Sequence, residues 1–411
     1  MNDLENLKKQ WKGIMSCMGC GDCGYAIRPA VGRFLTCPVK EAKGDAAFEV
    51  YFSRGRMNVL KSILQGKLSL SRELAEFVYQ CSECGNCTEV CHQTHNENIV
   101  LNTSKWIDHV EVWNALRKDL VDAGFAPLEK HQKLINLMND EIMRNPYGEE
   151  MAKKYDWASE FSNITEKGEL AIFGGCTMPL RQTSALNNMM KIFQAAGKEF
   201  AISKDEWCCG SIAMRIGDYN AVQELVEHNI NVFKEMGAKT IFSPCAGCYR
   251  TLSRDYPEII GEELPFEVKH ITEILVEMIR RNEIPFKEVS AEPIKVTYHD
   301  PCHLGRHMNL YESPREIIQN IPGVELVEMK RNRKHAWCCG AGGGVKSQFP
   351  DLAIEISKER IREALETGAK VLLTSCPFCI GNLSAALKEM PLEIQNQMQV
   401  VDIIDFIASK I

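Results

Sequence analysis

The sequence lacks several features that would assign it to common classes of protein. Its 411 residues include 48 lysines and arginines against 55 aspartates and glutamates, a formal net charge of -7. Nucleic-acid binding needs clustered basic residues, so this balance argues against a nucleic-acid partner. No run of about eighteen apolar residues occurs, and the first residues lack a basic segment followed by an apolar one. We therefore expect neither membrane insertion nor secretion.

Nucleotide-binding motifs are missing as well. The glycine-rich segment 340–344 lacks the Lys-Ser/Thr ending of a phosphate-binding loop, and it follows two cysteines instead of a strand. The sequence has no dinucleotide fingerprint either, so we expect any flavin or nicotinamide to lie on another subunit. The glycines are expected to let the backbone approach a cofactor closely or to leave space for a substrate.

Cysteine is abundant, and all eighteen cysteines fall into four regular sets with none left over. A long chain without a secretory signal is expected in the cytoplasm, where thiols stay reduced. There, Cys-x-x-Cys spacing is typical of metal or redox sites and not of disulfides. The pattern therefore indicates an iron–sulfur electron-transfer protein.

Two of the sets follow the spacing of two-cluster ferredoxins. In those proteins a Cys-x2-Cys-x2-Cys triplet provides three ligands of a cubane [4Fe-4S] cluster, and the fourth ligand comes from the segment of the other triplet. We expect two cubane clusters with the ligand sets Cys17, Cys20, Cys23 and Cys91, and Cys81, Cys84, Cys87 and Cys37. Thirteen residues separate Cys23 from Cys37 where three are typical. Paired four-cysteine zinc sites are the alternative.

The other ten cysteines lie in an internal repeat. Their spacing is Cys-x31-Cys-Cys-x35-Cys-x2-Cys in the first copy and Cys-x35-Cys-Cys-x36-Cys-x2-Cys in the second. Five thiolates exceed what a zinc ion or a cubane cluster takes, so each copy is expected to hold a larger or unusually shaped cluster. The two sets are Cys176, Cys208, Cys209, Cys245 and Cys248, and Cys302, Cys338, Cys339, Cys376 and Cys379.

Both copies alternate strand and helix signals. Apolar strands are expected at 170–173 and 294–298, and amphipathic helices at about 219–236 and 351–367. Such alternation predicts α/β units with parallel sheets, in which ligands bind at the carboxyl ends of the strands. The expected fold is α+β and α/β. It comprises a mostly helical ferredoxin-like domain with two [4Fe-4S] clusters (1–165) and two repeated domains (166–290 and 291–411).

The five-cysteine motifs resemble the cysteine-rich CCG domain. The chain has two copies of this domain after a ferredoxin-like segment. This layout is similar, over nearly the whole chain, to the D subunit of heterodisulfide reductases. The resemblance implies a noncubane [4Fe-4S] cluster on each five-cysteine set, two cubane clusters that feed them, and a disulfide substrate between the noncubane pair. The substrate of the family is the heterodisulfide of coenzyme M and coenzyme B. Both sets are complete here, which favours an oxidoreductase subunit acting on disulfide or thiol groups.

Reducing a disulfide to thiols takes two electrons and two protons, while the clusters deliver single electrons. His303, directly after Cys302, is the candidate for supplying a proton or contacting an anionic substrate. The alternative is a histidine that hydrogen-bonds a cluster sulfur. Other redox subunits, a flavoprotein or a membrane cytochrome, are the expected partners. The chain itself is expected to be cytoplasmic, whether or not it is peripheral to a membrane subunit.

A different function remains open, that of a non-catalytic electron-transfer subunit of a larger oxidoreductase. CCG domains with ferredoxin segments also resemble subunits of benzoyl-CoA reductase assemblies, of electron-transfer-flavoprotein-linked complexes, and of glycolate or lactate oxidation systems. A relay needs chained redox centres but no substrate pocket, and the atypical first cubane motif keeps this alternative open. A structural or regulatory zinc protein is a third class.

Overall fold

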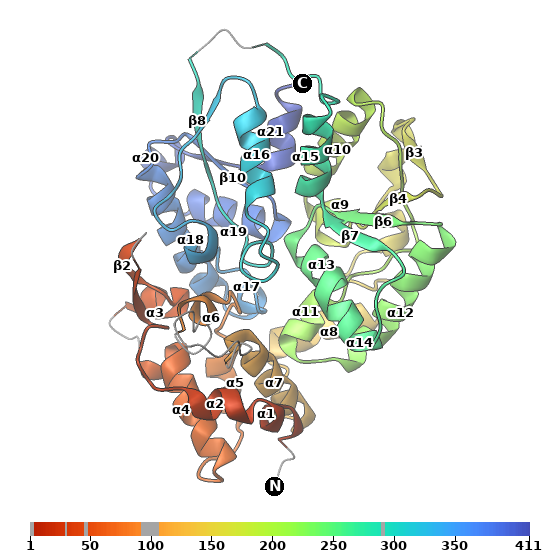
Figure 1. The fold of residues 1–411 in the computed structure, drawn as a ribbon. Helices are drawn as coiled ribbons and strands as arrows, with labels where there is room; N and C mark the ends of the chain where they lie inside the picture. The colour runs from red at the N-terminus through yellow and green to blue at the C-terminus, as the bar shows by residue number, and fades with distance from the viewer. Residues whose placement is uncertain (1–3, 29–30, 45–47, 92–106, 289–291) are drawn as a thin grey trace, which may run out of the picture. The chain divides into compact units, whose positions relative to one another are not determined.

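A computed structural model describes residues 4–28, 31–44, 48–91, 107–288 and 292–411. They form helices and parallel sheets, as predicted (Figure 1). Contacts divide the chain into two compact units: a smaller one of Met1–Lys133, Ile212–Tyr219 and Lys330–Arg360, and a larger one of Leu134–Ser211, Asn220–Met329 and Ile361–Ile411. This grouping interrupts both repeats, so the predicted boundaries of three domains stay a prediction.

The smaller unit is mostly helical. Its described sheet is a short antiparallel hairpin of β1 (Tyr25–Arg28) and β2 (Gly32–Leu35). Most of its helices have only four to seven residues. The unit contains α1 (Glu5–Lys9), α2 (Trp11–Ser16), α3 (Pro38–Lys43), α4 (Ser53–Leu64), α5 (Arg72–Val78), α6 (Asn86–Val90), α7 (His109–Asp122) and α17 (Val345–Gln348). The divisions between the units fall within α8 (Glu129–Asn139), α11 (Ser211–Ile216) and α18 (Pro350–Leu365), directly before α12 (Asn220–Glu235), and between Met329 and Lys330.

The larger unit contains two parallel sheets, one from each repeat (Figure 1). Their strand orders are β3-β5-β4-β6-β7 and β11-β10-β8-β9. In both, the strand that opens the repeat has the second strand on one side and the third on the other. This change of direction creates a switch point between the first and third strands, where sheets of this kind bind ligands. The strands are β3 (Ile164–Thr165), β4 (Leu170–Ile172), β5 (Phe200–Ala201), β6 (Thr240–Ser243), β7 (Glu267–His270), β8 (Ile294–Tyr298), β9 (Val324–Leu326), β10 (Val371–Thr374) and β11 (Gln399–Asp402).

The helices repeat together with the strands. Helix α10 (Thr183–Ala195) corresponds to α16 (Glu312–Asn320), and α15 (Ile271–Arg280) corresponds to α21 (Ile403–Ala408). Helix α10 packs against α21, and α15 packs against α16. Each repeat therefore contributes the same two helices to the contact between the repeats. The remaining helices of this unit are α9 (Thr177–Arg181), α12 (Asn220–Glu235), α13 (Ala246–Arg250), α14 (Tyr256–Ile260), α19 (Pro377–Lys388) and α20 (Leu392–Gln395).

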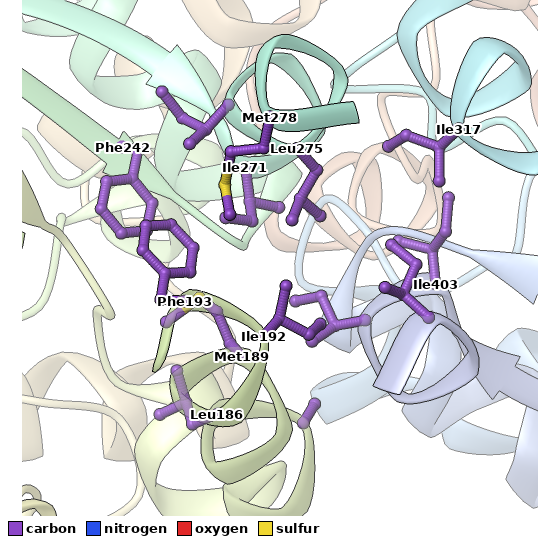
Figure 2. Close-up of a cluster of buried hydrophobic side chains, with 14 of the residues drawn as sticks. Leu186, Met189, Ile192, Phe193, Phe242, Ile271, Leu275, Met278, Ile317 and Ile403 are labelled. Atoms are coloured by element: carbon purple, nitrogen blue, oxygen red, sulfur yellow. The ribbon is translucent and has the colours of Figure 1, made fainter. Parts of the chain in front are cut away.

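One apolar core joins these helices to the sheets (Figure 2). The rings of Phe193 in α10 and Phe242 in β6 stack with centroids 5.4 Å apart. Ile192 of α10, Leu275 of α15 and Ile403 of α21 belong to the same core. Burial of such side chains is the main force that holds the two repeats together.

Equivalent caps begin the last helix of each repeat. The imidazole of His270 accepts a hydrogen bond from the Thr272 amide, and Glu273 accepts one from the His270 amide, which makes a capping box for α15. Asp402 plays the same part for α21, where its carboxylate accepts from the Ile404 amide at 2.9 Å. Within the described residues, no helix has both the length and the hydropathy needed to cross a bilayer.

Candidate iron–sulfur sites

The first ferredoxin-like triplet lines a pocket of the smaller unit. Cys17, Cys20 and Cys23 line this pocket, and Cys91, at the end of α6, lines it as well. Burial raises the pKa of Cys23 to about 12. A buried thiol of this kind becomes a thiolate when a metal takes the place of its proton. These four cysteines are the set that we predicted for the first cubane cluster, and the ligand assignment stays a prediction.

The second triplet lines a separate pocket in the same unit, and Cys37 lines it together with Cys81, Cys84 and Cys87. Burial raises the pKa of Cys37 to about 11, although the nearby Arg56 opposes the shift. Despite the long insertion before it, Cys37 therefore lies beside the triplet with which we predicted it to share a cluster.

A buried ion pair supports the second triplet. Glu83 lies between Cys81 and Cys84, and its side chain meets that of Arg117 at 2.7 Å, with both side chains fully buried. Arg117 also donates to the carbonyl oxygen of Cys81 at 2.7 Å. The guanidinium group therefore holds the backbone and the side chain of the cysteine loop together, and its planar set of donors suits that geometry.

The first five-cysteine set lies wholly within the larger unit. Cys176 comes after β4 and begins α9, and Cys245 comes after β6 and begins α13. Since β4 and β6 are neighbours with the switch point between them, these two cysteines lie where the sheet is expected to bind a ligand. The double cysteine Cys208-Cys209 precedes α11.

The five sulfur atoms of this set are linked by contacts. The sulfur of Cys176 lies 3.6 Å from that of Cys208. Hydrogen bonds from Cys208 and Cys248 lower the pKa of Cys209 to about 6. Cys248 also hydrogen-bonds Cys245. Five convergent sulfur donors exceed the four that zinc takes, and they fit an iron–sulfur cluster.

The second five-cysteine set is divided between the two units. Cys302, Cys376 and Cys379 belong to the larger unit, and Cys338 and Cys339 belong to the smaller one. Cys302 comes after β8, and Cys376 comes after β10 and begins α19, so both repeat the placement seen in the first set. Assembly of these five cysteines around one cluster stays a prediction.

Within the larger unit the two sets lie near each other. Cys248 lowers the pKa of the Cys245 thiol, whereas the thiol of Cys376, which belongs to the other repeat, raises it. His303 lies near Cys245 too, because a side-chain carbon placed on Gly247 would be 3.7 Å from the His303 Nδ1 and 3.6 Å from the Cys245 sulfur. His303 therefore directly follows Cys302, the first cysteine of one five-cysteine set, and lies near Cys245 of the other set.

The glycine-rich segment packs against the second triplet in the smaller unit. A side-chain carbon on Gly342 would lie 2.7 Å from the Ser82 carbonyl oxygen, and one on Gly343 would lie 2.4 Å from the Cys81 carbonyl oxygen. The backbone of this segment therefore closely approaches the loop that carries Cys81, while the expected approach to a cofactor stays a prediction.

Sequence reasoning missed the buried charges beside the cysteines. Lys154 and Glu206 pair at 2.7 Å in the larger unit, with no exposed side-chain surface. Burial lowers the pKa of Lys154 and raises that of Glu206, while their mutual attraction opposes both shifts. The position of Glu206, two residues before Cys208, was the available signal. The second repeat has Ala336 at that place.

Comparisons with known proteins agree with this arrangement. A family model for the cysteine-rich domain CCG matches residues 170–253 and 296–384. The chain is 35% identical over 425 residues to the D subunit of the dihydromethanophenazine:CoB–CoM heterodisulfide reductase of Methanosarcina barkeri, with 99% of this chain and 96% of the relative covered.

The matches with more distant relatives cover a smaller share of those proteins. The B subunit of the fumarate reductase (CoM/CoB) of Methanothermobacter marburgensis is 32% identical over 330 residues, which cover 80% of this chain and 61% of the relative. The EtfAB:quinone oxidoreductase of Syntrophomonas wolfei is 27% identical over 350 residues, with 80% and 46% covered.

These relatives and the four cysteine sets support iron–sulfur clusters and a role as a redox subunit of an oxidoreductase. The near-complete match in both directions, together with the two cysteine-rich domains, establishes that the chain belongs to the family of heterodisulfide reductase D subunits.

Proposed function

We propose that this protein is the catalytic iron–sulfur subunit of a heterodisulfide reductase-type complex. Its substrate is the heterodisulfide of coenzyme M and coenzyme B or a similar disulfide. The reaction converts R-S-S-R′, two electrons and two protons into R-SH and R′-SH. A partner redox subunit, either a flavoprotein or a membrane cytochrome, supplies the electrons.

The proximity of Cys245 to His303 and Cys376 of the other repeat is the observation that carries the proposal. A two-electron reaction on a disulfide benefits from two one-electron centres on the two sides of the scissile bond. The proximity between the repeats supports such a pair, and both five-cysteine sets are complete in this chain.

In this proposal each five-cysteine set holds a noncubane [4Fe-4S] cluster, and each ferredoxin-like set holds a cubane [4Fe-4S] cluster. When bound, the clusters supply electrons one at a time. The cysteine residues hold the clusters in place, and the buried surroundings of Cys208, Cys245 and Cys248 exclude water from the first noncubane site.

His303 provides a proton in the same proposal. Its imidazole lies near Cys245 of the other repeat, and it is only partly buried. An imidazole in such a position can receive a proton from solvent and donate it to a departing thiolate. His303→Gln should therefore slow disulfide reduction while the iron content and the cluster spectra stay unchanged.

The experiment that tests the function is anaerobic electron paramagnetic resonance (EPR) of the oxidised protein with and without coenzyme M. A new paramagnetic signal that appears only with the thiol supports disulfide chemistry. Isethionate, the alcohol analogue of coenzyme M, is the matched control and should leave the spectrum unchanged. Intact clusters that respond to neither compound contradict the proposal.

The likeness to the EtfAB:quinone oxidoreductase favours a second candidate, an electron-transfer subunit without a substrate of its own. With a viologen as electron donor, the two candidates predict different results. A disulfide reductase oxidises the viologen when the heterodisulfide is added, whereas a relay subunit only exchanges electrons with its clusters.

A further inference from the structure

A buried cation lies beside the first five-cysteine set. The ammonium group of Lys154 meets the Glu206 carboxylate at 2.7 Å and the Glu206 carbonyl oxygen at 2.8 Å. Neither side chain has exposed surface. Burying two charges is costly unless their remaining hydrogen bonds are made, so this pair requires an explanation.

Three donors converge on one oxygen of Glu206. Its Oε1 accepts from Lys154, from the Tyr155 hydroxyl at 3.0 Å and from the Gly175 amide at 2.9 Å. Hydrogen bonds to a carboxylate oxygen favour its ionised form, so these donors oppose the effect of burial, which raises the pKa of Glu206. The group is therefore a buried ion pair inside the larger unit.

This ion pair is attached to two ligand loops. Gly175 directly precedes Cys176, and Glu206 lies two residues before Cys208. Among charged groups, only Cys208 acts more strongly on the Cys176 thiol than Lys154 does. The positive end of the pair therefore acts on this cysteine in the direction opposite to that of Cys208 and burial.

The second repeat has a different charge arrangement. Ala336 stands where Glu206 stands in the first repeat, and Asp300 stands where Gly174 does. The buried Arg315 contacts two carboxylates there, Asp300 at 2.7 Å and Glu328 at 2.6 Å. Beside the first set Lys154 thus meets one buried carboxylate, whereas in the second repeat Arg315 meets two carboxylates, of which Glu328 is partly exposed.

We propose that Lys154 raises the reduction potential of the cluster on the first five-cysteine set above that of the second. This inference rests on the proposed function, because it requires a cluster on each set. A nearby cation stabilises the reduced, more negative state of a cluster, and low local polarity strengthens the effect. The site of the first repeat is then the one reduced first.

The test is a potentiometric titration of the complete protein, with EPR detection. We expect Lys154→Met to shift the reduced-to-oxidised ratio of one noncubane cluster at least tenfold toward oxidised at a fixed potential, which corresponds to about 59 mV for one electron. Lys154→Arg keeps the charge and should keep the potential. Lys153→Met is the matched control, because its side chain is 68% exposed.

Glu206→Gln separates the charge from a merely structural role. Removing the anion should move the potential in the direction opposite to that of Lys154→Met, whereas a structural role would make both variants lose iron. Unchanged potentials in iron-replete variants would overturn the inference, and so would shifts in the same direction.

Cys176→Ser assigns the affected signal to the first set. It also distinguishes a failure of the proposed cluster site from a failure of the proposed role of Lys154. If Cys176→Ser leaves all iron and all signals unchanged, the first five-cysteine site itself is wrong. If it alters the signal that Lys154→Met fails to shift, the site stands and the role of Lys154 is wrong.

Discussion

The hydroxyl oxygen of Ser82 lies 3.5 Å from the sulfur of Cys338 within the smaller unit. Ser82 belongs to the second ferredoxin-like triplet, and Cys338 belongs to the second five-cysteine set. Next to this contact, the backbone of Gly342 and Gly343 packs against Cys81 and Ser82 at distances that leave no room for a side chain. The loop of the second ferredoxin-like triplet and a loop of the second five-cysteine set are thus packed directly together.

Replacing Gly343 with alanine should disrupt this packing. The new carbon would lie 2.4 Å from the Cys81 carbonyl oxygen, so one of the two loops must move. We expect Gly343→Ala to lower the free energy of unfolding by about 1–3 kcal/mol more than a control glycine substitution does. Urea unfolding measures the loss, and iron analysis shows whether the second cubane cluster is retained.

Gly368→Ala is the matched control. Gly368 has a φ of 71°, close to the 62° of Gly343, but no atom lies within 4 Å of its added carbon. Both substitutions therefore carry the same backbone strain, about 1–2 kcal/mol. Equal losses of stability in the two variants would show that the loop contact contributes nothing.

Arg117 is expected to be essential for the loop of the second triplet. Arg117→Met leaves the fully buried Glu83 carboxylate without its ion-pair partner, which typically costs about 3–5 kcal/mol. The variant should unfold at lower urea and lose the cluster bound by Cys81, Cys84 and Cys87. Lys118→Met, which affects a surface pair with Asp122, should change stability by only about 0.5 kcal/mol. A stable Arg117→Met protein with full iron content would contradict this role.

Serine variants test the crossed ligand assignment. Cys17→Ser and Cys91→Ser should alter the same EPR signal, because both residues line the first pocket. Cys81→Ser and Cys37→Ser should both alter the other cubane signal, because both line the second pocket. If Cys37→Ser instead alters the signal that Cys17→Ser alters, each segment supplies all four ligands of its own cluster.

His131 should make the stability of the smaller unit depend on pH. Burial lowers its pKa to about 4, partly opposed by its hydrogen bond to the Gly344 carbonyl oxygen, and Arg117 nearby lowers it further. Since the unfolded imidazole has a pKa of about 6.5, the unfolded chain binds the extra proton first as the pH falls. Stability is therefore complete above pH 6.5 and is lost toward pH 4, by about 1.4 kcal/mol per pH unit.

The measurement is urea unfolding of the cluster-loaded protein at several values of pH between about 5 and 7.5. His131→Gln should show a shallower dependence than the unchanged protein, because glutamine does not titrate in this range. Identical slopes would mean that His131 keeps an ordinary pKa in the folded state.

Local spacing determined much of this protein. The four cysteine sets, the internal repeat and the alternation of strands with helices are short-range features, so the sequence predicted them directly. The expected helices at about 219–236 and 351–367 are α12 at Asn220–Glu235 and α18 at Pro350–Leu365. Amphipathic periodicity locates such helices well because burial of one face decides where they form.

Tertiary structure alone decided which distant groups meet. Lys154 and Glu206 are 52 residues apart, and nothing in their local sequence reveals that both are buried. Likewise, the packing of Gly343 against Cys81 depends on how loops far apart in the chain meet within the smaller unit. A charged side chain is ordinarily exposed, and only the complete set of packing contacts forces it inside. For this reason the sequence predicted the four cysteine sets as cluster ligands, whereas only the fold revealed the buried charges and backbone contacts that surround these cysteines.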